Sequence, residues 1–224
     1  HISEQLKEVN DCINHYNQRP VEWLYNNFKI DENHHLVHAT HLNKTEVDLI
    51  SKNNSNVILC PTTEGNLGDG IFPLREFQSY GGKWSIGTDS HIGLNPLEEL
   101  RILDYGQRLI SHKRNTFISE KTGNSGEFAI EMSTTTGRKA MNNFNVNYFS
   151  VGNVLNAFIV KKNSPLLASC SSENLASTIV YASDSSQREG TISNGEYLTN
   201  GRCKDYDQIQ ADFVATLNEL KNRL

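Results

Sequence analysis

The sequence lacks any long apolar run. Only 37% of its 224 residues are hydrophobic, and no stretch approaches the roughly 18 apolar residues that a membrane helix needs. A signal-peptide pattern and an initial methionine are also absent. We therefore expect a globular protein of the cytoplasm that has no membrane partner and whose sequence continues upstream of His1.

Cysteine pairs and basic clusters are absent as well. The four cysteines, Cys12, Cys60, Cys170 and Cys203, stand far apart, which predicts neither a disulfide framework nor a zinc ribbon. The formal net charge is -5, and lysine and arginine are spread thinly among the acidic residues. Without a basic stripe the chain has no electrostatic footprint for nucleic acid, so we expect no nucleic-acid partner.

Strand and helix signals alternate over residues 1–115. Short apolar runs predict the strands, and apolar residues at helical spacing predict the helices between them. The expected strands are residues 1–3, 35–39, 57–60 and 83–87. The expected helices are residues 5–17, 20–28, 45–52 and 74–80, and a last one opened by Pro96 with Leu97, Leu100, Leu103 and Leu109 along one face. Four such units are half of the eight in a barrel, so the predicted fold is α/β, the C-terminal half of a (β/α)8 TIM-type barrel.

The chain changes character from about residue 145. Residues 123–142 still predict a helix, which we expect to pack on the barrel half. Strands are expected at residues 157–161 and 179–182, a hairpin at Asn194-Gly195, and an amphipathic helix from Asp207 to the end. The expected domains are therefore residues 1–144, 145–204 and 205–224.

Polar side chains stand at the ends of the predicted strands. His1 and Glu4 stand at the first strand and His38 at the second. The region of Asn66 follows the third strand, and Asp89 ends the fourth. Because the C-terminal ends of barrel strands form one face, these groups are expected to converge. Two histidines and an aspartate suit a zinc-type ion, and a carboxylate that does not bind metal can move protons.

Each of these residues also has an ordinary structural interpretation. His38 could be a core histidine that bonds to the backbone, and Asp89 could cap a turn. For the set as a whole we favour a site, because histidine, histidine and aspartate at successive strand ends form a ligand set. The loop over residues 60–70 is either flexible backbone beside a ligand or a surface turn.

Other polar residues near the strand ends could contact a substrate or the ligands themselves. These are His41, Asn66, Ser90 and His91. The remaining histidines are assigned to the surface or to packing. They are His15, His34, His35 and His112.

The site residues stand in segments that resemble the amidohydrolase superfamily and, within it, the formiminoglutamate deiminases. The segments run in the family's order over most of residues 1–110. They read HISEQLKEVNDC, RPVEWL, LVHATHL, LCPTTEGNLGDGIFP, IGTDSH and EELRILDYGQRL. The resemblance implies that the predicted strands are strands 5 to 8 of a metal-dependent barrel. Residues beyond about 145 loosely resemble part of the family's small flanking β-sandwich domain.

The resemblance also implies a role for each central residue. His1 would be a metal ligand, and Asp89 would be both a ligand and the general base. Glu4 would be the proton shuttle, and His38 would stand beside the attacking water and the tetrahedral centre. One divalent ion is implied, Zn²⁺ in this reading, although the residues do not fix its identity.

The implied reaction is the hydrolysis of a small molecule, N-formimino-L-glutamate, to N-formyl-L-glutamate and ammonia in histidine degradation. A His-x-His ligand pair and the groups that hold the substrate carboxylates are expected in the missing N-terminal half of the barrel. This chain alone is therefore expected to be inactive. The resemblance leaves a homodimer open.

Two other functions stay open. A guanine or triazine deaminase of the same superfamily would share these strand-end residues. Such relatives usually show P-x-S-N where this chain has Pro61-Thr62-Thr63-Glu64-Gly65-Asn66. The other alternative is a non-catalytic domain that keeps the barrel half as a binding surface, because half a barrel exposes two sheet edges.

Overall fold

The computed structural model describes residues 1–114, 116–117, 123–199 and 203–223. The chain divides into two compact units. The first comprises residues 1–146 and 170–182, and the second comprises residues 147–169 and 183–224. Within the described residues, no helix is both long and apolar enough to cross a membrane.

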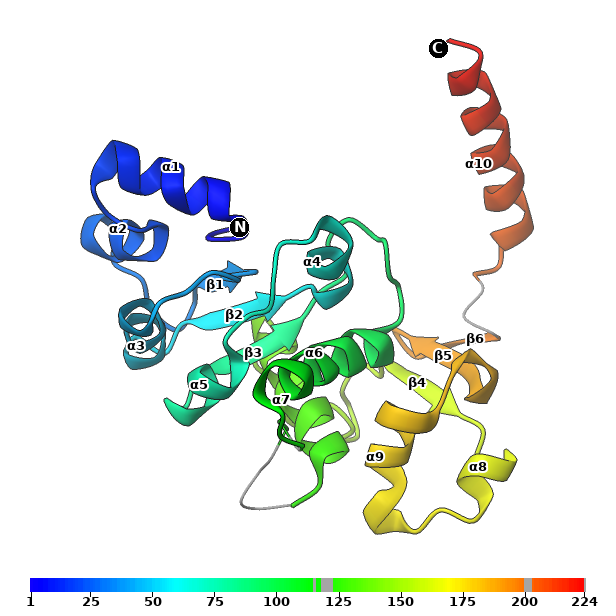
Figure 1. Cartoon of the computed structure of the whole chain (residues 1–224). Coiled ribbons are helices and arrows are strands. Elements are labelled where there is room, and N and C mark those ends of the chain that lie inside the picture. The colour runs from blue at the N-terminus through cyan, green and yellow to red at the C-terminus, as the bar shows by residue number, and fades with distance from the viewer. Residues whose placement is uncertain (115, 118–122, 200–202, 224) are drawn as a thin grey trace. The chain divides into compact units, whose positions relative to one another are not determined.

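A parallel sheet organises the first unit. Its strands are β1 (His35–Val37), β2 (Asn56–Leu59) and β3 (Lys83–Ile86), hydrogen-bonded in that order (Figure 1). Ile2 extends the series through an isolated parallel bridge to His38. The four strand positions expected from the sequence therefore exist, are parallel and follow one another in chain order, and the α/β class is confirmed.

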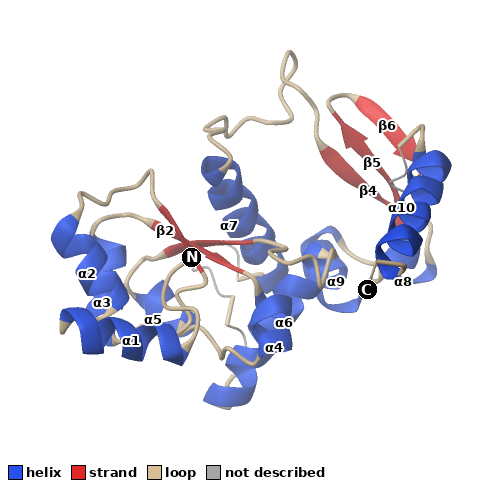
Figure 2. Ribbon diagram, turned by 90° about the horizontal axis from the view of Figure 1, so that it is seen from above, coloured by secondary structure: helices blue, strands red, loops and turns tan. Residues whose placement is uncertain are grey.

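Helices connect these strand positions, and Figure 2 shows them flanking the sheet. They are α1 (Leu6–Tyr16), α2 (Pro20–Asn27), α3 (Lys44–Lys52), α4 (Pro61–Leu67), α5 (Leu74–Ser79) and α6 (Pro96–Ser111). Proline opens α2, α4 and α6, where its fixed φ suits the first turn. Asn43 caps α3, because its side chain accepts from Glu46 N at 2.9 Å while the Glu46 carboxylate accepts from Asn43 N at 3.0 Å.

The core lies between one face of this sheet and the helices. Strand neighbours Leu36, Val57 and Trp84 are all buried on that face. Trp84 stacks on Phe117 with ring centroids 5.2 Å apart, and its indole nitrogen donates to Gln78 Oε1 at 3.1 Å. The alternate residues of the strands point to the other face, which is where Ser85 donates to Ser133 O at 2.7 Å.

Two further helices complete the first unit: α7 (Ser125–Ala140), which packs on β3, and α9 (Ser172–Ala182), which packs on α6 and α7. The expected helix over residues 123–142 is confirmed.

The strand expected at residues 179–182 is wrong, because these residues are the last turn of α9. A short apolar run does not distinguish a strand from a buried helix segment, and here Val180 is fully buried in the helical interface.

Two smaller expectations also fail. Leu109 is 75% exposed and does not belong to the buried face of α6, which instead contains Leu100, Leu103, Asp104 and Gln107. Much of the loop expected at residues 60–70 is helix α4. Gly68, at φ +71°, ends that helix in the left-handed conformation that glycine adopts without strain.

The second unit contains an antiparallel sheet. Its strands are β4 (Ala157–Val160), β5 (Arg188–Ser193) and β6 (Glu196–Thr199). The predicted hairpin is present, because Asn194 and Gly195 join β5 to β6 with positive φ values of 51° and 81°. The unit also contains α8 (Pro165–Ala168), a 3-10 turn (Ser185–Gln187) and the C-terminal helix α10 (Tyr206–Lys221). Since residues 170–182 belong to the first unit, only part of the stretch 145–204 is β-rich, and its assignment to a flanking β-sandwich stays a prediction.

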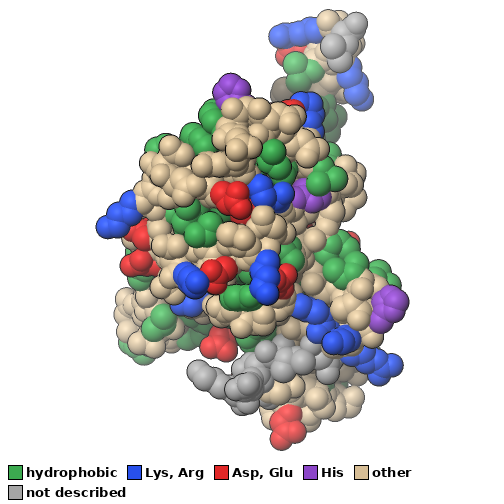
Figure 3. All heavy atoms as spheres, turned by 60° about the vertical axis from the view of Figure 1, so that its left-hand side comes forward, with side chains coloured by type: hydrophobic (Ala, Val, Ile, Leu, Met, Phe, Trp, Pro, Cys, Tyr) green, Lys and Arg blue, Asp and Glu red, His purple; other side chains and the backbone are tan. Residues whose placement is uncertain are grey.

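The charged side chains form no single-sign field on the face displayed in Figure 3. Acidic and basic groups are interspersed over most of that face. This distribution matches the thin spread of lysine and arginine along the sequence.

Gly126 is the residue at which α7 approaches α9 most tightly among the described glycines. A Cβ there would lie 2.4 Å from both the backbone nitrogen and Cα of Ser177. We expect Gly126→Ala to force the two helices apart and to lower the free energy of unfolding by about 1–3 kcal/mol. Urea unfolding measures this change. Gly65→Ala on α4 is the control, because a Cβ at Gly65 meets nothing within 4 Å, and an unfolding midpoint for Gly126→Ala at or above that of the control would contradict the prediction.

Candidate metal centre

Three side chains from three different strand ends converge in the first unit. His1 precedes the bridge at Ile2, His38 follows β1, and Asp89 follows β3. One ligand atom of each lies within 4.8 Å of the others. His1 Nε2 lies 3.4 Å from Asp89 Oδ1, and the rings of His1 and His38 are 5.2 Å apart. The structure therefore brings together residues that are up to 88 positions apart in the sequence.

The backbone turns sharply where these strands end. Ser3, His38, Ala39 and Asp89 have φ values between 44° and 66°. Non-glycine residues seldom adopt this left-handed conformation, and where they do the strain tends to mark functional sites. With extended backbone at these residues the strands would continue. The turns instead end the strands and leave His38 and Asp89 at the C-terminal edge of the sheet.

His38 is the buried centre of the cluster. Its side chain is fully buried, with Nε2 3.6 Å from Glu4 Oε1 and Nδ1 3.2 Å from Glu64 Oε1. Burial lowers the pKa of His38, but its hydrogen bond to Glu64 and the charges of Glu4, Glu64 and Asp89 together raise it above the ordinary value. The imidazole thus lies in a strongly acidic surrounding.

Glu4 reaches the same cluster from the loop that follows Ile2. Burial raises the pKa of Glu4, the charge of His38 lowers it, and the nearby carboxylates of Asp69 and Asp89 raise it further. The net effect is a carboxyl that holds its proton to higher pH than a free glutamate does. A carboxyl with a raised pKa is a better proton donor candidate than an ordinary glutamate.

Glu64 is a member of this cluster that the sequence did not single out. It lies in the first turn of α4, and its Oε1 accepts from Cys60 N at 2.8 Å as well as contacting His38. The sequence held one signal that could have found it. Pro61 followed three residues later by a glutamate is a typical helix start, so the segment could have been recognised as a helix whose first turn faces the strand ends.

Helix α4 is itself held in place by two side-chain contacts. Glu99 on α6 is buried and accepts from Thr62 N at 2.9 Å and from the Thr62 hydroxyl at 2.5 Å. Thr63 and Ser90 are joined through their hydroxyls at 3.1 Å. Burial raises the pKa of Glu99, although its hydrogen bonds to Thr62 lower it.

The other residues predicted as contacts lie around the cluster. Ser90 lies beside Asp89 and bonds Thr63 as described. His41 donates its backbone N–H to Ser3 O at 3.1 Å, and its ring lies against Gly70. Asn66 is exposed on α4, and His91 is exposed in a turn. In the described residues no hydrogen bond joins any of these four to His1 or His38, and their role as substrate contacts stays a prediction.

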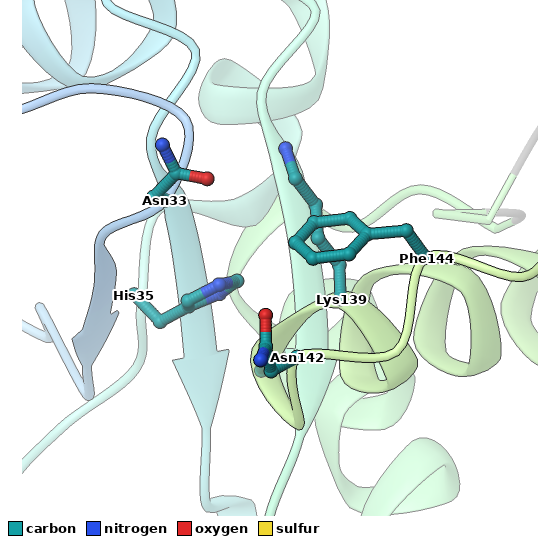
Figure 4. A pocket seen from close by; sticks show the side chains of 6 residues that line it. Asn33, His35, Lys139, Asn142 and Phe144 are labelled. Atoms are coloured by element: carbon teal, nitrogen blue, oxygen red, sulfur yellow. The ribbon is translucent and has the colours of Figure 1, made fainter.

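A separate cavity lies at the opposite end of β1. Its volume is about 110 Å³. Its lining residues are Asn33, His35, Lys139, Ala140, Asn142 and Phe144. Figure 4 shows the His35 ring pointing toward Lys139 and Asn142. Burial and the charges of Lys139 and His34 lower the pKa of His35, and none of the residues that line this cavity belongs to the cluster around His38.

The cluster fits a divalent ion by its donor chemistry. His38 Nε2 is buried and makes no hydrogen bond within the part of the chain that the structure describes. An orphaned imidazole nitrogen facing a second imidazole and a carboxylate is the arrangement that a zinc-type ion satisfies. His1 and Asp89 each offer a further donor atom within 4.8 Å of the ligand atom of His38.

Comparison with known proteins shows which family this chain matches. A family model described as the amidohydrolase family matches residues 1–198. Formimidoylglutamate deiminase of Pseudomonas aeruginosa is 36% identical over 221 residues, covering 98% of this chain and 49% of that protein. A 5-methylthioadenosine/S-adenosylhomocysteine deaminase of Natronomonas pharaonis is 25% identical over 207 residues, covering 90% of this chain and 45% of that protein. The chain thus spans about half the length of the curated relatives it matches.

Solved structures show the same relation. An amidohydrolase from Brucella melitensis superposes with a TM-score of 0.89 at 30% identity, covering 98% of this chain and 48% of that one. An adenosine deaminase from Xanthomonas campestris, solved with bound zinc, superposes with a TM-score of 0.82 at 21% identity, covering 100% of this chain and 49% of that one. The second likeness concerns the fold alone.

Proposed function

Because this chain belongs to the amidohydrolase family, we propose that it supplies the C-terminal half of the (β/α)8 barrel of a metal-dependent hydrolase that acts on C–N bonds. Ile2, β1, β2 and β3 would be strands 5 to 8. The convergence of His1, His38 and Asp89 at the strand ends carries this proposal. The rest of the barrel and the remaining ligands would come from residues outside this chain, so the chain alone would be inactive.

The proposed cofactor is one divalent ion, Zn²⁺ by analogy with the zinc-containing neighbour. His1 and Asp89 would hold it, with His38 Nε2 facing the same position. Such an ion supplies Lewis-acid activation, which lowers the pKa of water from 15.7 toward roughly 7. An acidic residue of the site could then deprotonate the attacking water at neutral pH.

The chain's own side chains would manage the protons. Asp89 would accept a proton from the attacking water as general base. His38 would stabilise the developing tetrahedral centre, with its Nε2 accepting a hydrogen bond from the attacking water. Glu4 lies 3.6 Å from His38 Nε2 and would carry a proton to the departing nitrogen. Its raised pKa suits this task, because a carboxyl must be protonated for part of the cycle to act as an acid.

The proposed substrate is N-formimino-L-glutamate. Water would add to the formimino carbon, the bond from that carbon to the terminal nitrogen would break, and the products would be N-formyl-L-glutamate and ammonia. The support is the 36% identity to formimidoylglutamate deiminase over nearly the whole chain. The step would serve histidine degradation in the cytoplasm, on a free small molecule.

A coupled ammonia-release assay on the complete protein tests this proposal. N-formimino-L-glutamate is supplied with and without a chelator, and zinc is then restored. Ammonia release that the chelator stops and zinc restores is the expected result. Release from guanine and not from formiminoglutamate would keep the site and change the substrate. No release from either substrate with the metal bound would contradict the proposed reaction and would favour a non-catalytic domain.

A further inference from the structure

The side chain of Glu64 joins three parts of the first unit. Its Oε1 accepts from Cys60 N at 2.8 Å, at the end of β2, and lies 3.2 Å from His38 Nδ1, at the end of β1. The residue itself belongs to α4 and is 4% exposed. One oxygen atom therefore lies in contact with both strand ends in a position that water does not reach.

The chemistry of these contacts assigns the hydrogen between Glu64 and His38. Cys60 N–H donates to Oε1, so Oε1 acts as an acceptor. The hydrogen on the 3.2 Å contact must then come from His38 Nδ1, which donates to the same oxygen. A neutral imidazole with its hydrogen on Nδ1 has its lone pair on Nε2. In His38 this is the buried nitrogen that faces His1 and Asp89.

The position of Glu64 is fixed by groups on the far side of α4. Thr62 is bonded through both its N–H and its hydroxyl to the buried Glu99 of α6. Thr63 is bonded to Ser90, the residue after Asp89. Helix α4 therefore connects the end of β3 and helix α6 to His38, and it cannot rotate without breaking these half-buried hydrogen bonds.

We propose that Glu64 is a positioning residue that holds the hydrogen of His38 on Nδ1 and so aims the Nε2 lone pair at the reaction centre. This inference rests on the proposed function, since it gives a task to a neighbour of His38. It concerns orientation and tautomer, which a carboxylate beside the far nitrogen of a histidine controls in many metal sites. Glu64 need not touch the substrate to act in this way.

The test compares Glu64→Gln with Glu64→Leu in the complete protein. The amide oxygen of glutamine can still accept from Cys60 N and His38 Nδ1, whereas leucine has a similar volume and no acceptor. Nitrogen-15 NMR of labelled histidine reads the tautomer in the metal-free protein, and the His38 signals are assigned with a His38 variant. We expect the Nδ1–H tautomer in the wild type and in Glu64→Gln, and a mixture in Glu64→Leu.

Turnover and zinc retention provide the second readout. We expect Glu64→Leu to lose about 10–100-fold in kcat or in zinc affinity, with KM little changed, and Glu64→Gln to keep most of both. Glu46→Leu is the structural control. It removes a buried carboxylate of α3 that bonds Arg19 and the backbone of Val21, and none of these bonds involves α4 or His38, so it should lower the unfolding midpoint and leave the tautomer unchanged.

Two results would overturn the inference. One is a wild-type His38 with its hydrogen on Nε2, which needs no variant to fold. The other is a folded Glu64→Leu protein with an unchanged tautomer and unchanged kcat. A wild type that releases no ammonia yet shows the Nδ1–H tautomer would contradict the proposed reaction and leave the contact between Glu64 and His38 established, so the two failures are distinguishable.

Discussion

The Asp89→Asn variant of the complete protein is expected to lose both its metal and its turnover. Asp89 Oδ1 lies 3.4 Å from His1 Nε2, and one ligand atom each of His1, His38 and Asp89 lies within 4.8 Å of the others. The negative charge of Asp89 therefore lies where it would attract the ion. An amide has no negative charge to hold a cation and is too weak a base to accept a proton from water. Removing a general base alone costs roughly 10²–10⁴-fold in rate, and the loss of metal adds to this.

Zinc content after dialysis and kcat for ammonia release measure the two effects. Asp48→Asn on α3 is the matched control, because the one ion pair that Asp48 makes among the described residues is with Lys52, at 2.7 Å on the helix surface. The control should keep wild-type metal and turnover. An Asp89→Asn protein that retains stoichiometric zinc and more than a tenth of the wild-type kcat would remove Asp89 from both proposed roles.

Glu4→Gln is expected to separate metal binding from catalysis. Glu4 is not among the three convergent ligand candidates, and its carboxylate instead faces His38 Nε2 at 3.6 Å. Glutamine keeps the shape of the side chain but cannot carry a proton between the water and the leaving nitrogen. We therefore expect bound zinc to be unchanged and kcat to fall by roughly 10²–10⁴-fold.

Metal analysis and steady-state kinetics on the same preparation test this separation. Glu131→Gln, an exposed position on α7, makes the same chemical change away from the cluster and should behave as wild type. Normal turnover in Glu4→Gln would exclude Glu4 from proton transfer. Loss of zinc together with turnover would instead assign it a ligand role.

Local pattern predicted the elements that depend on local physics. The strands at residues 35–37, 56–59 and 83–86 lie in short apolar or alternating segments, and these signals act within a few residues. The hairpin at Asn194-Gly195 was equally predictable, because both turn positions need positive φ. Helix α9 was missed because a short apolar run such as residues 179–182 does not by itself distinguish a strand from a helix segment.

The candidate site divides in the same way. His1, Glu4, His38 and Asp89 were recognisable because each stands where a predicted strand ends, and parallel strands end at one face. Glu64 was not, because its importance comes from a contact with His38 across 26 positions of sequence. Glu99, which holds α4 through Thr62, lies on α6. Nothing in the sequence separation of Thr62 and Glu99 indicates that their side chains meet.

The sequence by itself thus determined the strands of the parallel sheet and most of the helices between them, that they alternate as in a parallel α/β protein, and which polar residues stand at the strand ends. Only the tertiary structure decided how those ends meet: the left-handed turns at His38 and Asp89, the buried Nε2 of His38, which makes no hydrogen bond within the described residues, and the helix that holds Glu64 against Nδ1 of the same ring. The physical reason is that periodicity and turn chemistry act over a few residues. The hydrogen bonds and the burial of the site instead join segments that are far apart in the sequence, and only the packing of the sheet and helices brings those segments together.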